Sequence, residues 1–307
     1  MEYYEFRAMD SVILMGAEGQ GTAAGFEAAR SFIEAAEERF SRFRETSELS
    51  YLNRSAGQWT SVSPDLFEVL DLSLTYYRAT GGLFAPSILP DLQRAGYTRS
   101  MDELRAQGVD PVSADHFPSR APAFDSLRLD HARSRVFLSQ GMQIDLGGIA
   151  KGWIAERAAE VLSAYSTACA VSAGGDMFMI GHPQGQAGWD VALEDPRDPA
   201  SDIITLWIDQ GAVVTSSVAK RTWRQGNQLR HHLIDPRSGQ PAQTPWLSVT
   251  VLAPHAALAE TFAKAILIGG PRTADRLTRE NTAIKFLAVD ADGQLWNSAH
   301  HKEPVYA

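Results

Sequence analysis

Residues 144–153 read IDLGGIAKGW, which is an apolar strand end, a pair of glycines and the first turn of a helix. Glycine allows backbone N–H groups to approach a ligand closely, and the N-terminus of a helix favours an anion. Lys151 adds a positive charge at the same place. The segment therefore favours a phosphate-bearing ligand. The alternative is an ordinary turn before a capped helix with a solvated lysine.

Around this segment, short β-type runs outnumber helices. Apolar residues spaced three and four apart predict a helix over 23–43, and further helices are predicted over 64–80, 148–164 and 256–268. Runs of strand composition cover 4–15, 126–129, 136–138, 168–172, 189–193, 203–208, 213–214, 229–234, 247–252, 284–289 and 295–296. Strands follow strands more often than they alternate with helices, so we expect an α+β fold with largely antiparallel sheets and flanking helices. A polar stretch over 102–122 contains three prolines and is expected to be a surface insertion or linker.

The composition is that of an ordinary globular protein, with 307 residues, 44% hydrophobic and 21% charged. Twenty-eight Lys+Arg against 37 Asp+Glu give a formal net charge of −9, which opposes binding to nucleic acid. No apolar stretch approaches the roughly 18 residues that a membrane span needs, and the acidic N-terminus is unlike a secretory signal. With no lipidation cysteine after it, we expect a cytoplasmic protein without membrane insertion. The single cysteine, Cys169, is expected to be buried and structural.

Three other segments carry candidate chemistry. The glycine cluster over 16–25 has the spacing GxGxxxG, so it favours a flexible hairpin-like turn over the GxGxxG site of a nicotinamide-dependent oxidoreductase. A second glycine turn, SAGGD, occupies 172–176 after an apolar strand. The segment HHLIDPRSGQP over 231–241 could present imidazole, carboxylate, guanidinium and hydroxyl groups at one edge of a turn.

Taken in order, these motifs resemble the ApbE-type FAD:protein FMN transferases. That family moves FMN from FAD to a threonine of a target flavoprotein through a phosphoester, with release of AMP. The similar segments are FRAM at 6–9, FSRF at 40–43, SELSYLN at 47–53, GGLFAPS at 81–87, DLGGIAKG at 145–152, SAGGD at 172–176, TS at 215–216 and HLIDPRSG at 232–239. The resemblance is nearly end to end, so it implies one flavin-transferase domain of T-fold-like architecture over 1–307.

The resemblance also implies roles for individual residues. It places the flavin-site contacts at Met9, Leu83, Phe84 and Ala85, and further cofactor contacts at Asp145 and Lys151. His232 would lie beside the phosphates of FAD. The proton of the acceptor threonine needs a base, for which Asp235, Glu260 and His232 are all candidates.

In the family, a magnesium ion is held by a backbone carbonyl of the glycine-rich turn, here Gly148 or Ala150, and by an Asp and a Thr of a late helix. That helix has the family motif ADALAT, whereas residues 259–264 of this chain read AETFAK. Glu260 therefore replaces the Asp and Lys264 replaces the Thr. An ammonium offers no oxygen ligand to Mg²⁺ and repels it at close range.

Two hypotheses follow for this pair. One is an ordinary ion pair at i and i+4 of a helix. The other is that the Lys264 ammonium takes the place of the metal, neutralises the FAD pyrophosphate and acts in catalysis. Ala85 and Ser217 are further departures, since the family has Asp and Gly there.

The expected activity is flavinylation of a target flavoprotein that carries an Asp/Ser-Gly-Ala/Ser-Thr acceptor motif, with FAD as substrate and Mg²⁺ as the family's metal. The chain has no such motif of its own. Two alternatives are a protein that binds FAD without cleaving it and an FAD pyrophosphatase that yields FMN and AMP.

Overall fold

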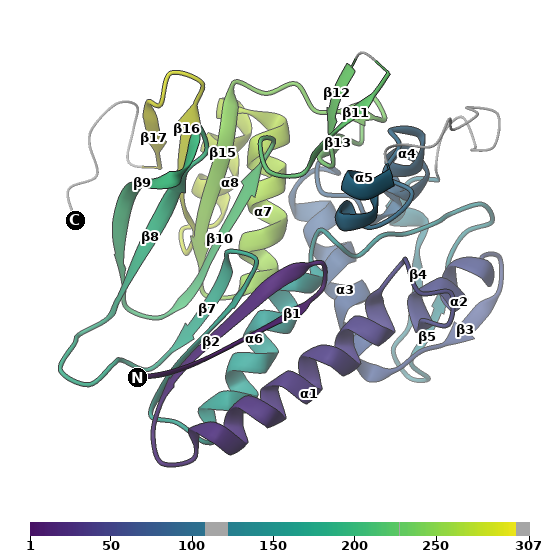
Figure 1. Cartoon of the computed structure of the whole chain (residues 1–307). Helices are drawn as coiled ribbons and strands as arrows, with labels where there is room; N and C mark the ends of the chain where they lie inside the picture. The colour runs from purple at the N-terminus through teal and green to yellow at the C-terminus, as the bar shows by residue number, and fades with distance from the viewer. Residues whose placement is uncertain (108–121, 227, 299–307) are drawn as a thin grey trace. The chain divides into compact units, whose positions relative to one another are not determined.

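The computed structural model describes residues 1–107, 122–226 and 228–298 (Figure 1). The chain divides into two compact units. Unit 1 comprises Met1–Ala36, Lys151–Ala219 and Thr244–Ala307, and unit 2 comprises Glu37–Ala150 and Lys220–Gln243. A single transferase domain that includes both stays a prediction.

Unit 1 is built on an eight-stranded sheet in which every neighbouring pair is antiparallel. In sheet order the strands are β1 (Glu2–Ala8), β2 (Ser11–Glu18), β6 (Ala168–Ala173), β7 (Asp176–Ile180), β10 (Gly211–Ser217), β15 (Trp246–Ala253), β16 (Lys285–Asp290) and β17 (Leu295–Asn297). Its helices are α1 (Thr22–Phe40), which begins in this unit, α6 (Ala150–Ser163), α7 (Ala256–Gly269) and α8 (Pro271–Glu280). The predicted α+β class with largely antiparallel sheets is confirmed.

The two faces of this sheet are covered differently, as strand β6 shows. Successive side chains of a strand point to opposite faces. The Cys169 thiol donates to the carbonyl of Ala159 in α6 at 3.4 Å, so this face packs on helices. Burial raises the pKa of the Cys169 thiol, as expected for a structural cysteine. Ala168 and Ala170 belong instead to the apolar cluster formed with strands β8 (Trp189–Asp195) and β9 (Asp198–Ile208), so this hairpin covers the opposite face.

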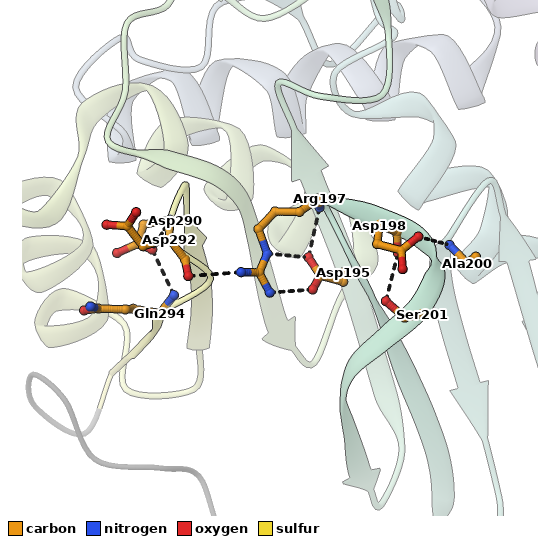
Figure 2. A network of polar contacts seen from close by, with 8 residues as sticks. All are labelled: Asp195, Arg197, Asp198, Ala200, Ser201, Asp290, Asp292 and Gln294. Atoms are coloured by element: carbon orange, nitrogen blue, oxygen red, sulfur yellow. Dashed lines mark hydrogen bonds and ion pairs between the residues drawn. The ribbon is translucent and has the colours of Figure 1, made fainter.

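A polar network holds the tip of the β8–β9 hairpin beside the β16–β17 turn (Figure 2). The Arg197 guanidinium bonds both carboxylate oxygens of Asp195, and its Nη1 donates to the carbonyl of Asp292 at 3.0 Å. These hydrogen bonds lower the pKa of Asp195 to about 2. In the same turn, the Asp290 carboxylate accepts the backbone N–H of Asp292 and of Gln294. The network therefore ties the turn of the β8–β9 hairpin to the turn between β16 and β17.

Helix α7 is the central helix of unit 1. It contacts β10 and β15 most extensively, and Figure 1 shows it beside α6 behind the strands. Its sequence AALAETFAKAILIG is apolar on nearly all sides, which is typical of a helix buried in a core. Glu260 and Thr261 are buried with it, and the Thr261 hydroxyl donates to the carbonyl of Ala257. Among the described helices, none combines the length and apolar character needed to cross a bilayer.

Unit 2 contains short elements. Its helices are α2 (Glu48–Arg54), α3 (Pro64–Ala79), η1 (Pro86–Ile88), α4 (Leu89–Arg94), α5 (Met101–Gln107) and η3 (Phe124–Ser126). Strands β3 (Trp59–Ser61), β5 (Arg135–Phe137) and β4 (Arg128–Asp130) form one sheet, and β11 (Thr222–Gln225) with β12 (Gln228–His231) and β13 (Ile234–Asp235) with β14 (Gln240–Pro241) form two more. Ser47 and Ser63 cap α2 and α3 by accepting backbone N–H groups, as their sequence positions favour. Trp223 joins the two chain segments of the unit, because its indole donates to the carbonyl of Ala95 at 2.8 Å.

Several sequence predictions need correction. The run over 4–15 is a hairpin rather than one strand, because Met9 and Asp10 both have positive φ and form a two-residue turn. The glycine cluster over 16–25 was expected to form a hairpin-like turn, but it contains the connection between strand β2 and helix α1. Gly25 lies inside that helix. The predicted helix over 23–43 ends at Phe40. The start of the stretch over 102–122 belongs to helix α5, in which Leu104 is buried, and 108–121 lie outside the described residues.

Candidate functional site

Asp145 lies in unit 2 on an extended segment that is not a strand, which corrects the prediction of a strand end at Ile144. The Asn53 side chain forms both backbone hydrogen bonds that a neighbouring strand would provide to Ile144, at 2.8 and 2.9 Å. The next residue, Asp145, donates its N–H to the carbonyl of Pro86 and accepts the N–H of Gly147. A single amide side chain therefore replaces a sheet partner and fixes the position of the Asp145 carboxylate.

Arg42 is a residue of this region that sequence reasoning missed. Its Nε is 2.8 Å from an Asp145 oxygen, and its side chain is only 6% exposed. The guanidinium lies over the rings of Phe43 and Tyr97, 4.2 and 4.4 Å from their centroids, and Nη1 donates to the Tyr97 carbonyl at 2.9 Å. Its Nη2 is buried and has no hydrogen-bond partner among the described residues. The FSRF motif was the available signal, since an arginine between two phenylalanines suits cation–π contacts.

Substitution of Arg42 by Met is expected to lower the free energy of unfolding by about 2–3 kcal/mol, because it leaves the half-buried Asp145 carboxylate without its ion-pair partner. Urea unfolding measures the change. In the double variant with Asp145→Asn the loss should be smaller than the sum of the two single losses, since the unpaired charge is gone. Additive losses would show that the two side chains do not interact.

The GGLFAPS loop is also in unit 2, between α3 and η1. Leu83, Phe84 and Ala85 are all buried, and the Phe84 N–H donates to the Thr80 hydroxyl at 3.2 Å. Gly81 has a φ of 65°, in the left-handed region that glycine adopts at least cost. Contact of these side chains with a flavin stays a prediction, as does that of Met9, which is half-buried in the β1–β2 turn of unit 1.

The segment over 232–239 forms the β13–β14 turn of unit 2. The Arg237 guanidinium bonds both oxygens of Asp235, at 2.9 and 2.7 Å. Burial opposes ionisation of Asp235, but these hydrogen bonds and the Arg237 charge outweigh it and keep the pKa of Asp235 below its ordinary value. Gly239 has a φ of 69°, and a Cβ there would lie 2.8 Å from a carboxylate oxygen of Asp91. His232 is half-buried just before β13.

Unit 1 brings four charged side chains together, from α6, β7 and α7. Lys151 is in the first turn of α6 and forms an ion pair with Asp176, the first residue of β7. Its Nζ also lies 3.9 Å from Oε1 of Glu260 in α7. The same oxygen is 3.0 Å from Nζ of Lys264, one turn further along α7. We call Asp176, Lys151, Glu260 and Lys264 the charge network.

The charge network is almost completely removed from water. The side chain of Glu260 is 0% exposed and that of Asp176 3%, while Lys264 and Lys151 keep 13% and 16%. Burial opposes ionisation of Glu260, but the charges of Lys264 and Lys151 and a hydrogen bond from Gly152 together lower its pKa. Glu260 is therefore an anion, and the two carboxylates and two ammonium groups balance in charge.

Gly152 allows α6 and α7 to approach closely at this network. Its N–H donates to Oε2 of Glu260 at 2.8 Å. A Cβ at this position would lie only 2.6 Å from the carbonyl oxygen of Ala256. Four residues further along α6, the Glu156 carboxylate accepts the N–H of Ala256 at 2.7 Å, which satisfies a backbone donor of the first turn of α7. The IAKG motif thus supplies Lys151, which joins the charge network, and Gly152, which allows the first turns of α6 and α7 to lie close together.

The predicted site residues therefore fall into two groups. In unit 1 the structure brings Lys151, Glu260 and Lys264 together and adds Asp176, which the sequence indicated only as part of a glycine turn. Asp145, His232 and Asp235 lie in unit 2, as do the carbonyls of Gly148 and Ala150. Within the described ranges, no cluster of three or more His, Cys, Asp or Glu side chains is arranged to hold a metal ion.

Comparison with known proteins defines the family. The family model described as the ApbE family matches residues 7–288. The FAD:protein FMN transferase of Treponema pallidum is 28% identical over 278 residues, covering 83% of this chain and 74% of that protein. That of Escherichia coli K12 is 22% identical over 294 residues, covering 94% and 83%.

Solved structures show the same fold. The ApbE protein of Thermotoga maritima superimposes with a TM-score of 0.84 at 24% identity, covering 97% of each chain. The flavinyl transferase ApbE of Pseudomonas stutzeri, in its apo form, has a TM-score of 0.80 at 19% identity, covering 96% of this chain and 93% of that one. With a family match over nearly its whole length and the same fold as these structures, the chain belongs to the ApbE family.

Proposed function

We propose that this protein is an FAD:protein FMN transferase, which moves FMN from FAD to a threonine of a target flavoprotein and releases AMP. Membership of the ApbE family supports this class of reaction, and the relatives from Treponema pallidum and Escherichia coli carry that name. The observation that carries the proposal is the ammonium of Lys151, held in the first turn of α6 by buried carboxylates. A fixed cation at a helix N-terminus suits a diphosphate.

The proposed step is a displacement at phosphorus. The threonine oxygen attacks the FMN-side phosphorus of FAD, the P–O bond to the AMP moiety breaks, and the threonine proton passes to a base. Such reactions depend on alignment and on charge stabilisation more than on covalent chemistry by the protein. Lys151 would stabilise the charge that develops on the phosphate oxygens. Met9, Leu83, Phe84, Ala85 and Asp145 would hold the flavin nucleotide.

Among the three candidate bases, the local contacts disfavour Asp235 and Glu260. The Asp235 carboxylate is bound at both oxygens by Arg237, and its pKa is lowered. Glu260 is fully buried and also has both oxygens bonded. His232 is half-buried and has an imidazole, the side chain whose ordinary pKa is nearest to neutral.

A magnesium ion at Glu260 does not fit the residues present. Mg²⁺ takes oxygen ligands in near-octahedral geometry. Oε1 of Glu260 faces two ammonium groups, and Oε2 accepts the N–H of Gly152. The proposed step therefore involves no metal bound to Glu260.

The proposed partner is a flavoprotein that presents an Asp/Ser-Gly-Ala/Ser-Thr acceptor motif. Such a partner fits the formal net charge of −9, which disfavours nucleic acid. The cytoplasm as the location of the reaction stays a prediction.

Incubation of the protein with FAD and a peptide containing the acceptor motif tests the proposal. We expect a flavinylated peptide by mass spectrometry and an equal amount of AMP by chromatography, and neither with a peptide in which Ala replaces the threonine. AMP without any peptide would instead indicate an FAD pyrophosphatase. Saturable FAD binding with no AMP would indicate a binding protein.

His232→Ala should reduce the rate of flavin transfer by about 10²-fold or more, because the threonine proton then has no positioned acceptor. The matched control is His182→Ala in unit 1. The imidazole of His182 is exposed, and the contact that the structure gives it is with Asp209. This control should keep the rate of the unmodified protein. Equal rates for all three proteins would remove His232 from the reaction.

A further inference from the structure

We propose that Lys264, held by Glu260, permanently occupies the position of a divalent cation, so that this protein binds and processes its diphosphate substrate without metal at this place. This inference rests on the proposed function for the identity of the substrate. Its structural part, the exclusion of a divalent cation from Glu260, stands on the charge network alone.

Glu260 has no oxygen available to a metal. Oε1 is 3.0 Å from the Lys264 ammonium and 3.9 Å from that of Lys151. Oε2 accepts the N–H of Gly152 at 2.8 Å. The carboxylate is 0% exposed, so no water surrounds it from which a hydrated ion could exchange ligands. A metal could bind only by displacing an ammonium group.

Electrostatic repulsion also opposes a divalent cation at Glu260. A Mg²⁺ ion bonded to Oε1 would lie about 2.1 Å from it, next to the two lysine ammonium groups that approach the same oxygen. Like charges at this separation repel strongly where little water screens them, and the two lysine side chains keep only 13% and 16% of their exposure. Rotation of Glu260 cannot relieve the repulsion, because Gly152 holds its other oxygen at the crossing of α6 and α7.

Lys264 is held in place as a fixed cation. It extends from the centre of a buried helix, and its partner Glu260 lies one turn before it in the favourable i, i+4 order. Asp176 neutralises Lys151 in the same way, so the four side chains together carry no net charge. Lys264 therefore has its counter-ion within the protein, at low solvent exposure. A cation fixed in this way needs no recruitment before it stabilises a phosphate.

Magnesium binding to the full-length protein is the direct test, and it does not depend on enzyme activity. After treatment with a chelator and its removal, MgCl₂ at millimolar concentration is titrated into the protein in a calorimeter without flavin. We expect no binding heat from the unmodified protein, and one Mg²⁺ per chain from Lys264→Thr, which replaces the ammonium by an oxygen. The control Lys285→Thr makes the same change at an exposed position of β16 and should gain no Mg²⁺.

The activity of the same proteins tests the function of Lys264. AMP release by the unmodified protein should stay within about twofold when a chelator is added, since no metal contributes at this site. Lys264→Met, which has neither ammonium nor oxygen, should lose about 10²-fold in rate with and without MgCl₂. AMP release by Lys264→Thr should be at least about tenfold faster with MgCl₂ than without it.

One Mg²⁺ bound by the unmodified protein at millimolar concentration would overturn the inference. So would a Lys264→Thr protein that binds no more Mg²⁺ than the unmodified protein, because Lys264 would then not be what excludes the ion. Absence of both FAD binding and AMP release in the unmodified protein would contradict the proposed function, and the calorimetry would still decide the exclusion of metal.

Discussion

Replacement of Glu260 by Ala is expected to lower the free energy of unfolding by about 3–5 kcal/mol, which is the cost of removing one partner from a buried ionic cluster. The variant leaves the ammonium groups of Lys264 and Lys151 facing each other at low exposure. It also leaves the N–H of Gly152 without its acceptor. Urea unfolding followed by circular dichroism measures the change.

Two controls separate charge from packing at this position. Glu260→Gln keeps the side-chain volume and an acceptor for Gly152 but removes the charge, so its stability should lie between those of Glu260→Ala and the unmodified protein. Glu34→Ala removes an exposed carboxylate from the i, i+4 pair with Arg30 and should leave the unfolding free energy nearly unchanged. A loss below about 1 kcal/mol for Glu260→Ala would mean that the cluster contributes no more than a surface ion pair.

Gly152→Ala is expected to cost about 3 kcal/mol of stability, although alanine is intrinsically better than glycine in a helix by about 1 kcal/mol. The added methyl group would lie 2.6 Å from the carbonyl oxygen of Ala256, a backbone atom that cannot rotate away. The helices α6 and α7 must therefore separate, and the hydrogen bond from Gly152 to Glu260 lengthens as they do. Thermal unfolding provides the measurement.

Glu160→Ala is the matched control for this prediction. It introduces an alanine on the same helix, at an exposed position whose side chain forms only a surface ion pair with Arg157 among the contacts that the structure gives it, and such a pair contributes little to stability. We expect its melting temperature to stay close to that of the unmodified protein. If Gly152→Ala proved as stable as Glu160→Ala, the close approach of α6 and α7 would not be a constraint on this residue.

Patterns within short windows of the sequence were enough for the class of fold and for most elements. The apolar run of α7, the β-type runs of the large sheet and the glycine turn before Asp176 all have local causes, namely residue spacing and backbone preference. The pairing of Glu260 with Lys264 is local in the same sense, because residues four apart on a helix face each other. The order of the motifs along the chain was likewise sufficient to identify the family.

Local sequence patterns did not predict three features of the fold. Ile144 has strand composition, but its backbone is bonded by the side chain of Asn53, which lies 91 residues earlier. Helix α8 was missed because its sequence is mostly polar and only Ala274 and Leu277 are buried. The turn at Met9 was missed because nothing in an apolar alternating run indicates two consecutive residues of positive φ.

The amino-acid order alone therefore accounts for most of the helices and strands, for the family and for the presence of a lysine one helical turn after Glu260. The folded chain decides what that lysine does. Lys151, Asp176 and Glu260 come from two helices and a strand, and Glu260 is 108 residues from the Gly152 N–H that it accepts. Charges so far apart in sequence interact strongly only when packing brings them together and removes the water between them. No pattern within a short window of the sequence indicates which of these charged groups will be neighbours in the folded chain.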